Sequence, residues 1–572
     1  MLHKYFFVFV LLFGGCLSLR AQSQAGGFDY NWANYGASDF GPKAVTFDTT
    51  GIRHIEHAPA TGIHPRVFFG PSELPEIQNR LATTVSGQEA MKQLHAYTTL
   101  LHLGYSNGGS YSHWNTPYGT DAFNNKRIDN AGKWDSHVYY YDLIAGDLTA
   151  LDNADAKRRY LLASIMVLEA FECLLYAGQT DTDTGLNYDD RAADLAKAMK
   201  TWADIVSGDP AVNSGTYNMF GGEHMALCYD LNFNSMTVAQ QDAVRMALAQ
   251  IIIASPRYGA TTAPHATTSN WVGLNTFEII TNLAIENEAG YNPTLNEEYM
   301  RAYWNFITYG WYESGVPFEG MGKNYQMVSM MVAMAKRGYS LLGHPNVRAY
   351  GNNFLPAITQ PYGGAFIGTD VWGGTGWNAE IGGYKFHTND VVGLKWAFPN
   401  DQNIDFVWRN YIEQWYFLQN STTGDYVYQQ FEPSTNGYHS QLLLGAIFAQ
   451  DYQAGNWETQ NQNTLQTESF FGPERGLGII RSDFSQDAML MHYHCRQDMG
   501  GHTHGDRNGF TLSALGRIFM PYTFGKEFQR TTYNSCILVN DLGIAISPNE
   551  GRKARQMGTI LDFQENTDYA KI

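Results

Sequence analysis

Two histidines and an aspartate alternate in the stretch "GGHTHGDRNGFTLSALGR", residues 500–517. Alternate side chains of a β-strand lie on the same face of the sheet. His502, His504 and Asp506 would therefore point the same way, while Phe510 and Leu512 continue the alternation into a core. Such a cluster is typical of a metal site, of acid–base chemistry or of a polar ladder, and the pattern leaves the three open.

Two other groups have residue types suited to chemistry. His492 and His494 alternate in the strand-like stretch "MHYHCR", where Arg496 could bind a sugar acid; a structural ladder is the alternative. Glu223 and His224 begin a predicted helix after "FGG", where they could face a cleft or belong to the core.

The elements that must position these residues begin as helices. Apolar residues recur at three- and four-residue spacing, which predicts helices. These segments start near Glu73 and continue at 136–148, 155–177, 187–206, 237–254, 271–288, 295–312, 324–342, 401–419 and 437–451. Ser72 and Thr237 are expected to cap two of them. Successive helical hairpins without strands between them predict a helical toroid or solenoid.

The period changes to two after a Gln- and Asn-rich linker at 453–469. "GLGIIRSDF", "AMLMHYHCR", "GFTLSALGRIFM" and "SCILVNDLGIAI" read as strands of an antiparallel sheet. Few sheet-like residues precede the last residue, Ile572. We therefore expect an incomplete β domain in a fragment of a longer protein.

Composition bounds the class of protein. A chain of 572 residues is too long for one compact core, so two domains or a large helical array are expected. Residues 1–21 read as a secretory signal with cleavage after Ala21, and their apolar run is too short to span a bilayer. The protein is expected to be secreted or periplasmic, with lipid anchoring at Cys16 as the alternative.

Charge and cysteine content exclude other classes. The net charge of −18 argues against nucleic acid as a partner, and an anionic substrate would need a local basic patch. Cys173, Cys228, Cys495 and Cys536 have no paired spacing, so buried free thiols are expected instead of disulfides or a thiolate metal site. Aromatic residues make up 14% of the chain, and aromatic faces can bind sugars.

Five stretches, in order along the chain, carry a family resemblance. They are "HPRVFFGPSELPEIQNRL", "ALCYDLNF", "SNWVGLNTFEIITNLAIENE", "ESGVPFEGMGKNYQM" and "FFGPERGLGIIRSDF…GGHTHGDRNGFTLSALGR". The chain resembles the heparinase II/III-like polysaccharide lyases, whose relatives include alginate, ulvan and glycosaminoglycan lyases and dermatan sulfate epimerase. The resemblance implies an α+β fold, with an incomplete α/α toroid followed by an antiparallel β-sandwich. The implied division is a signal peptide at 1–21, an N-terminal extension at 22–60, the toroid at 61–455 and the β domain at 466–572.

The resemblance also implies a reaction, the β-elimination of a glycan at a uronic acid. Asn270 matches the residue that binds the uronate carboxylate; a helix N-cap is its structural alternative. His502 matches the catalytic histidine, and Tyr325 is the expected catalytic tyrosine. Because Lys323 stands where many relatives have that tyrosine, Tyr309 and Tyr312 are alternatives to Tyr325. The expected substrate-binding residues are Lys323, Trp271, Arg496, His224 and Glu223.

A metal is implied by the same comparison, because His504 matches a ligand that is usually bound to zinc. The other ligands of the relatives fall where this chain has Tyr522 and Tyr533, which leaves the site short of the three or four ligands that zinc needs. Asn534 or Glu527 could complete it. We expect no required cofactor, with a structural zinc or other divalent ion as the alternative.

The leading interpretation is thus a secreted lyase acting on an anionic, uronate-containing polysaccharide. A uronate epimerase of the same fold and a non-catalytic glycan-binding protein are the alternatives. A glycoside hydrolase would need two opposed carboxylates, and no pair has a motif behind it. The sequence leaves the identity of the polysaccharide and the oligomeric state open.

Overall fold

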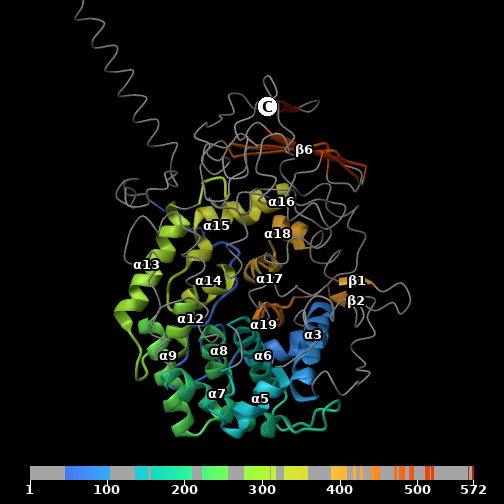
Figure 1. Ribbon diagram of the computed structural model, residues 1–572. Coiled ribbons are helices and arrows are strands. Elements are labelled where there is room, and N and C mark those ends of the chain that lie inside the picture. The colour runs from blue at the N-terminus through green and yellow to red at the C-terminus, as the bar shows by residue number, and fades with distance from the viewer. Residues whose placement is uncertain are drawn as a thin grey trace, which may run out of the picture.

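The computed structural model describes the protein at residues 45–103, 136–152, 156–208, 222–254, 276–309, 311–316, 327–358, 388–408, 417–419, 426–428, 440–450, 469–472, 476–483, 488–494, 509–515, 517–520, 564–565 and 570–571. Within these residues the chain is mostly helical, with a small antiparallel sheet near the C-terminus (Figure 1). None of the described helices is both long and apolar enough to cross a membrane.

Six described helices contact one another in a closed ring (Figure 1). In ring order they are α6 (Ala156–Leu175), α8 (Gly222–Asn232), α12 (Thr276–Ala284), α14 (Met327–Ala335), α17 (Thr388–Ala397) and α19 (Ser440–Ile447). Each helix contacts the next, and α19 contacts α6. The sequence explains the burial of this layer, because α14 reads "MVSMMVAMA" and such an apolar helix is stable only when neighbours cover it.

Further helices pack around the ring. These are α2 (Leu74–Thr83), α3 (Val85–Leu103), α5 (Ser136–Ala145), α7 (Tyr188–Gly208), α9 (Val238–Ala254) and α13 (Pro293–Tyr309). Only a short 3₁₀ turn, η6 (Phe233–Ser235), joins α8 to α9, and these two helices contact each other, so they run antiparallel. Thr237 caps α9, because its Oγ1 accepts from the Gln240 backbone N–H while the Gln240 side chain accepts from the Thr237 N–H.

A segment near the N-terminus connects the C-terminal ends of all six ring helices. We call residues 48–80 the strap. Its bonds to four ring helices involve backbone carbonyls at or next to the helix end. The Leu175 carbonyl of α6 accepts from Gln78 Nε2 at 2.9 Å, and the Lys336 carbonyl, just after α14, accepts from the Ala58 N–H at 3.0 Å. The Ala397 carbonyl of α17 accepts from the Arg53 N–H at 2.8 Å, and the Ile447 carbonyl of α19 accepts from Arg80 Nη2 at 2.6 Å.

The strap binds the other two ring helices through carboxylates. Asp230 lies in the last turn of α8, and Glu288 lies four residues after the end of α12. Both bind the His64 ring, at 2.7 Å and 2.9 Å. All six helices therefore end at the strap and run in the same direction, and their N-terminal ends lie together at the opposite side of the ring.

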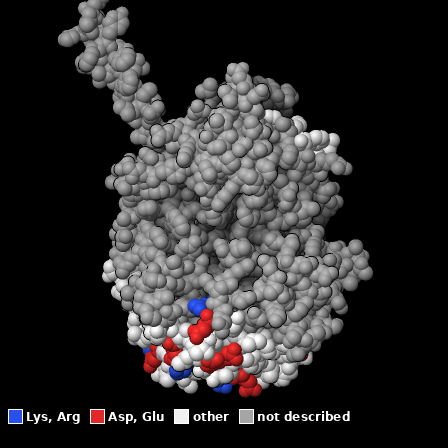
Figure 2. Space-filling view, in the orientation of Figure 1, with Lys and Arg blue, Asp and Glu red and all other residues white. Residues whose placement is uncertain are grey.

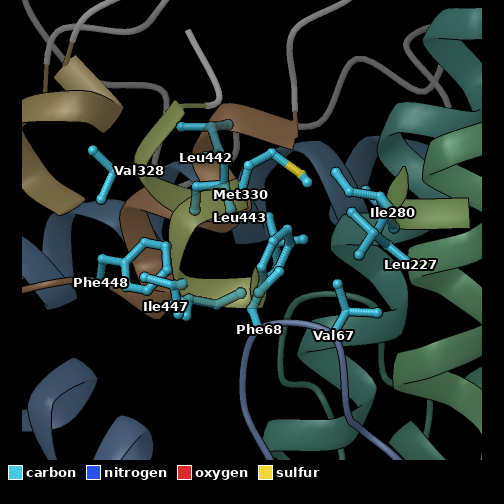
Figure 3. Packing of buried hydrophobic residues seen from close by; sticks show 14 of the residues in the cluster. Val67, Phe68, Leu227, Ile280, Val328, Met330, Leu442, Leu443, Ile447 and Phe448 are labelled. Carbon is cyan, nitrogen blue, oxygen red and sulfur yellow. The ribbon is translucent and has the colours of Figure 1, made fainter. Parts of the chain in front are cut away.

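The strap also contributes to the hydrophobic core. Val67 and Phe68 are buried and belong to the same cluster as the ring helices. Figure 3 shows them beside Leu227 of α8, Ile280 of α12 and Ile447 of α19. Burial of a large apolar side chain contributes about 1.5–3 kcal/mol, so the strap is held by packing as well as by hydrogen bonds.

The sheet has five strands in sequence order, all antiparallel. They are β3 (Ser469–Gly472), β4 (Leu477–Arg481), β5 (Leu490–His494), β6 (Gly509–Ala514) and β7 (Arg517–Met520). A register shift between Leu512 and Ser513 marks an irregularity in the β6–β7 pair. Two short hairpins, β1 (Phe417–Gln419) with β2 (Tyr426–Tyr428) and β8 (Gln564–Glu565) with β9 (Ala570–Lys571), stand apart from this sheet.

The sheet packs on a helical connection that follows α14. This connection comprises η8 (Leu341–Gly343), α15 (Pro345–Ala349), the π-helical η9 (Tyr350–Phe354) and α16 (Leu355–Ile358); α18 (Gln402–Val407) contacts η9 and α16. The Phe354 ring lies 5.7 Å from the Phe470 ring of β3, and Arg481 of β4 donates to the Pro356 carbonyl at 3.1 Å. The sheet therefore shares its core with the helices.

Several predictions about local structure were wrong. Ser72 does not cap α2, because its hydroxyl donates to Glu56 and Glu73 is the N-cap residue. The helix expected at 401–419 ends at Val407, and residues 417–419 form β1. The helices α3 and α17 and the strand β3 were not predicted. The expectation of free buried thiols is confirmed for Cys173 and Cys228; Cys495 and Cys536 lie outside the described residues.

Candidate functional site

Most residues expected to bind or transform a substrate lie outside the described residues. These are Asn270, Trp271, Lys323, Tyr325, Arg496 and His502, and the predicted metal ligands His504, Glu527 and Asn534 lie outside them as well. The elements that follow three of them are described, however. Asn270 precedes the start of α12 by six residues, Tyr325 precedes α14 by two, and His502 precedes β6 by seven. Their roles stay predictions.

The helices that follow two of these segments, α12 and α14, contact each other. The ring helix α12 contacts α8 on one side and α14 on the other. Since the C-terminal ends of these three helices meet the strap, their N-terminal ends lie together on the far side of the ring. A nine-residue helix such as α12 or α14 is about 14 Å long, which separates the predicted site from the strap.

Glu223 and His224 lie at the N-terminal end of α8, on the same side of the ring. Their exposed fractions are 5% and 0%, and His224 Nδ1 lies 3.5 Å from Glu223 Oε1. Burial lowers the pKa of His224 to about 3, so the ring is neutral at physiological pH. The structure thus places both side chains inside the helical core, and their role in substrate binding stays a prediction.

Tyr309 and Tyr312, the alternatives to Tyr325, lie at the end of α13 and just after it. The Tyr312 side chain is buried, with an exposed fraction of 3%, and its backbone N–H donates to Val316 in a turn. The left-handed conformation of Gly315 closes this turn against the backbone of Ala349 and Tyr350, where a Cβ would lie 2.3 Å from the Tyr350 nitrogen. Tyr312 therefore has a structural position.

His492 lies in the middle of β5 with an exposed fraction of 1%. It pairs with Ile479 of β4 and Thr511 of β6, and its neighbour Met491 is more exposed. The strand alternation thus directs His492 to the buried face of the sheet. This position fits the structural ladder that the sequence left open.

A polar joint links three of the stretches that carried the family resemblance. Asp230, in "ALCYDLNF", accepts from the backbone N–H groups of Arg66 (2.8 Å) and Val67 (3.0 Å) in "HPRVFFG". Glu286, in "AIENE", binds Arg66 Nη2 at 3.3 Å and Arg337 at 3.1 Å. Sequence reasoning assigned these charged residues no role, although charges within otherwise apolar stretches indicate buried partners.

The His64 imidazole lies at the centre of this joint. Burial alone would lower the pKa of His64, but its hydrogen bonds to the Asp230 and Glu288 carboxylates outweigh burial and raise this pKa. The Tyr229 hydroxyl donates to Glu288 at 2.6 Å, as does Arg245 Nη1 at 3.5 Å, so this carboxylate has three partners, His64 included. The joint is a buried ionic network that fixes the strap to α8 and α12.

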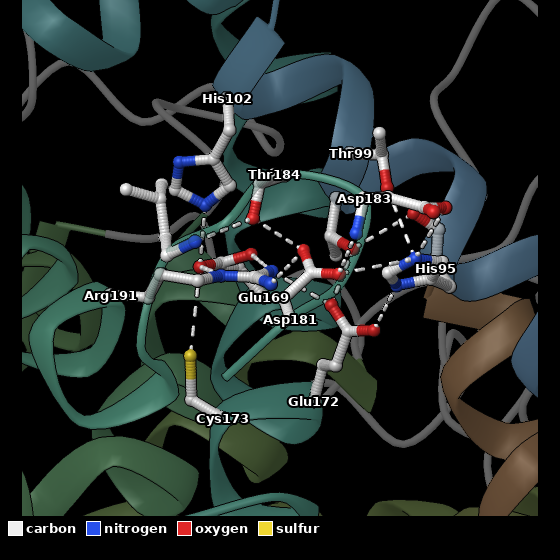
Figure 4. Close-up of polar contacts among 12 residues, drawn as sticks. His95, Thr99, His102, Glu169, Glu172, Cys173, Asp181, Asp183, Thr184 and Arg191 are labelled. Atoms are coloured by element: carbon white, nitrogen blue, oxygen red, sulfur yellow. Dashed lines mark hydrogen bonds and ion pairs between the residues drawn. The ribbon is translucent and has the colours of Figure 1, made fainter. Parts of the chain in front are cut away.

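A second buried network lies among α3, α6 and α7 (Figure 4). Arg191 binds both oxygens of Glu169, through Nε at 2.8 Å and Nη2 at 2.5 Å. It also binds Glu172 (2.8 Å) and Asp181 (3.0 Å), and all four side chains are at most 2% exposed. Two glutamates in the apolar helix "LLASIMVLEAFECLL" were the sequence signal for this network, because buried carboxylates require partners.

The charges in this network fix one another. Burial would lower the pKa of Arg191 and raise that of Glu169, but each group is held in its ionised form by the charge and hydrogen bonds of the other. His95 binds Glu172 at 2.5 Å and Asp183 at 3.2 Å, which outweighs burial and raises its pKa to about 9. His95 is thus a cation at neutral pH, and it cannot serve as a general base.

No group of three or more His, Cys, Asp or Glu residues in the described ranges has the arrangement of a metal site. The predicted ligands His504, Asn534 and Glu527 are not among those residues. The zinc site therefore stays a prediction.

No family model and no curated protein matches the chain. Among solved structures, the heparan sulfate lyase HepC from Pedobacter heparinus is similar at 13% identity and a TM-score of 0.42, over 84% of this chain and 70% of the other. The heparinase III BT4657 gene product is similar at 11% identity and a TM-score of 0.41, over 82% of this chain and 71% of the other. Similarity at this level does not assign the chain to a family.

Proposed function

We propose that the protein is a polysaccharide lyase that cleaves a uronate-containing polysaccharide by β-elimination. The observation that carries the proposal is the common direction of the six ring helices. Because every C-terminal end meets the strap, the segments with Asn270 and Tyr325 enter α12 and α14 from the same side of the ring. The helices that follow Asn270 and Tyr325 thus begin on the same side of the ring, which supports a site shared by residues that lie more than fifty positions apart in the sequence.

We infer that the ring and the helices around it form the α/α toroid expected from the sequence, with the sheet as part of the β domain. Ser314 supports the placement of this domain near the predicted site. A Cβ at Gly472 of β3 would lie 3.1 Å from Ser314 Oγ, and the chain continues from Ser314 toward Tyr325 and α14. Ser314, eleven residues before Tyr325, thus lies beside β3.

The helix direction also favours an anionic substrate. Each helix N-terminus carries a partial positive charge equivalent to roughly +0.5, and six of them lie on the side opposite the strap. The negative C-terminal ends face Arg53, Arg66 and Arg80 of the strap. In the view of Figure 2, acidic and basic side chains of the described residues lie together at the lower edge, where Figure 1 places α5 and α7.

The proposed reaction removes a weakly acidic proton beside a carboxylate. In this proposal, the Asn270 amide donates to the carboxylate as charge develops on it. Tyr325 takes the proton and then protonates the leaving glycosidic oxygen, and His502 supports the ionised phenol or shares the proton transfer. Holding a tyrosine ionised near pH 7 requires about 4 kcal/mol from such neighbours. No step passes through a metal.

The test is a panel of heparan sulfate, chondroitin sulfate, alginate and ulvan, followed by the absorbance of the unsaturated uronate product. We expect one of them to give this product with the wild type and not with Asn270→Ala. The assay is run in deuterated water, so that an epimerase would be recognised by deuterium in intact chains. Deuterium uptake without a new double bond, or no reaction with any substrate, would contradict the lyase proposal.

A further inference from the structure

A pocket of about 640 Å³ opens at the C-terminal end of α14. Its walls come from α13, from the turn that follows α14 and from Phe47, next to the strap. Tyr325 and the predicted catalytic region precede the opposite end of α14, about 14 Å away along the helix. The pocket is therefore separate from the proposed active site.

Three aromatic side chains line this pocket: Phe47, Trp304 and Tyr339. Phe47 and Tyr339 are 41% and 46% exposed, so a ligand in the pocket can reach both rings. Small-molecule pockets in proteins typically have 300–1,000 Å³, so this volume suits one or two sugar rings. Sugar rings present C–H faces that pack on aromatic side chains.

The walls are fixed by bonds outside the pocket. The Phe47 ring packs edge-on against His344 at 5.8 Å, and the next residue, Asp48, donates its N–H to the Gly343 carbonyl at 2.9 Å. Gly338, with a φ of +86°, ends the helical conformation after α14. The Tyr339 N–H donates back to the Met334 carbonyl at 3.0 Å. The aromatic surface is thus preorganised.

The charge of the pocket selects against anions. Glu297 is the only charged side chain among the residues that line it, all of which are described. Lys336 and Arg337, which precede the lining residue Gly338, are buried in ion pairs with Glu73 and Glu286. The C-terminal end of α14 adds partial negative charge. A uronate or sulfate group would therefore be repelled, whereas uncharged hydroxyls can donate to Glu297.

We propose that this pocket is an accessory binding site for neutral sugar residues, separate from the site of cleavage. Such a site would hold an uncharged part of a mixed polysaccharide, or a neutral glycan beside it, while the other side of the ring acts on uronate. The accessory role rests on the proposed lyase function, whereas the binding of neutral sugar rests on the composition of the pocket alone.

The test is titration calorimetry of the full chain with cellohexaose, xylohexaose and mannohexaose as neutral probes, and with hexagalacturonate as the anionic probe. We expect at least one neutral hexamer to bind and hexagalacturonate at the same concentration to show no binding at this pocket. Tyr339→Ala should weaken neutral binding about tenfold, the equivalent of 1.4 kcal/mol. Tyr141→Ala is the matched control, because Tyr141 is 37% exposed on α5 and does not line the pocket.

Phe47→Ala provides a second variant in case Tyr339→Ala fails to fold. The proposal would be overturned if none of the neutral hexamers bound, or if both variants bound them as tightly as the wild type does. Turnover of any cleavable polysaccharide should be the same in Tyr339→Ala and in the wild type. A failure of the accessory site is thus distinguishable from a failure of the lyase reaction.

Discussion

The Asp230 carboxylate binds the His64 ring at 2.7 Å and so joins the last turn of α8 to a strap residue 166 positions earlier. The same carboxylate accepts from two strap backbone N–H groups. One side chain thus satisfies three donors that would otherwise be buried without a partner. Each such donor left unsatisfied costs about 1–3 kcal/mol.

Asp230→Ala should therefore destabilise the protein by about 3–5 kcal/mol, as expected when one partner of a buried charged network is removed. The measurement is the free energy of unfolding in urea. Asp204→Ala is the matched control, since Asp204 forms an exposed pair with Lys200 on α7 and its loss should cost at most about 1 kcal/mol. Equal effects of the two substitutions would show that the joint is not a fixed point of the fold.

Stability should depend on pH through His95. Its pKa is raised to about 9 in the folded protein from 6.5, so the folded state binds the proton more tightly than the unfolded state. The resulting stabilisation, about 3 kcal/mol, is fully present below pH 6.5 and is lost as the pH rises through 9. His64, whose pKa is also raised, changes stability in the same direction.

The check is the melting temperature of wild type and His95→Gln between pH 6 and pH 10. The wild type should lose stability over this range, and the variant should lose distinctly less. His137→Gln is the control, because the His137 ring bonds to a neutral backbone carbonyl, that of Leu101, at 2.9 Å. Parallel curves for wild type and His95→Gln would refute the assignment.

Tyr325→Phe should abolish elimination while it preserves folding, because the substitution removes only the phenolic oxygen. Tyr312→Phe is the matched control, since Tyr312 is buried in a turn after α13. Steady-state turnover of the polysaccharide identified in the panel separates the two. If Tyr312→Phe were inactive and Tyr325→Phe active, the tyrosine assignment would be wrong.

His502→Ala should reduce turnover by about 10²–10⁴-fold, the usual cost of losing a general acid or base. Its far-ultraviolet circular dichroism should match that of the wild type. His492→Ala makes a useful contrast, because His492 is buried in β5 and its loss should lower stability first. Nearly full activity of His502→Ala would remove it from the mechanism.

The purified protein should contain less than one zinc per chain, because His504 is the only ligand that the family pattern supplies without a substitution. Chelation should then leave the melting temperature unchanged, since only a metal bound to the folded state stabilises it. Elemental analysis after dialysis, with a melt in chelator, makes the measurement. If the protein contained one zinc per chain and lost much of its stability when the zinc was removed, His504 would be assigned as a metal ligand, together with Asn534 or Glu527.

Periodicity in the sequence predicted most ring helices, because each has a continuous apolar face. The two helices that it missed contain glycines, which lower helix propensity. Gly87 in α3 lies against α2, where a Cβ would be 2.6 Å from the Arg80 carbonyl, and a Cβ at Gly393 in α17 would be 2.6 Å from Val328 of α14. The neighbouring helices lie so close that only glycine fits at these two positions, although other residues form helices more readily.

The polar networks could not be predicted from local patterns. Glu169 and Glu172 are visible as charges in an apolar helix, but their partner Arg191 belongs to the next helix and His95 to an earlier one. Pairing across such distances depends on the fold. The predicted catalytic residues came from resemblance alone, and only Glu223 and His224 among those expected to bind or transform the substrate lie within the described residues.

The strap has a consequence for synthesis on the ribosome. Arg80 leaves the ribosome early, but its acceptor at Ile447 follows 367 residues later. At about 5–20 residues per second, this interval lasts roughly 20–75 s. During that time the nascent chain contains ring helices but not yet the bond between the strap and α19. The ring can close only after α19 is made, so a truncation before Ile447 should leave the earlier helices dependent on chaperones.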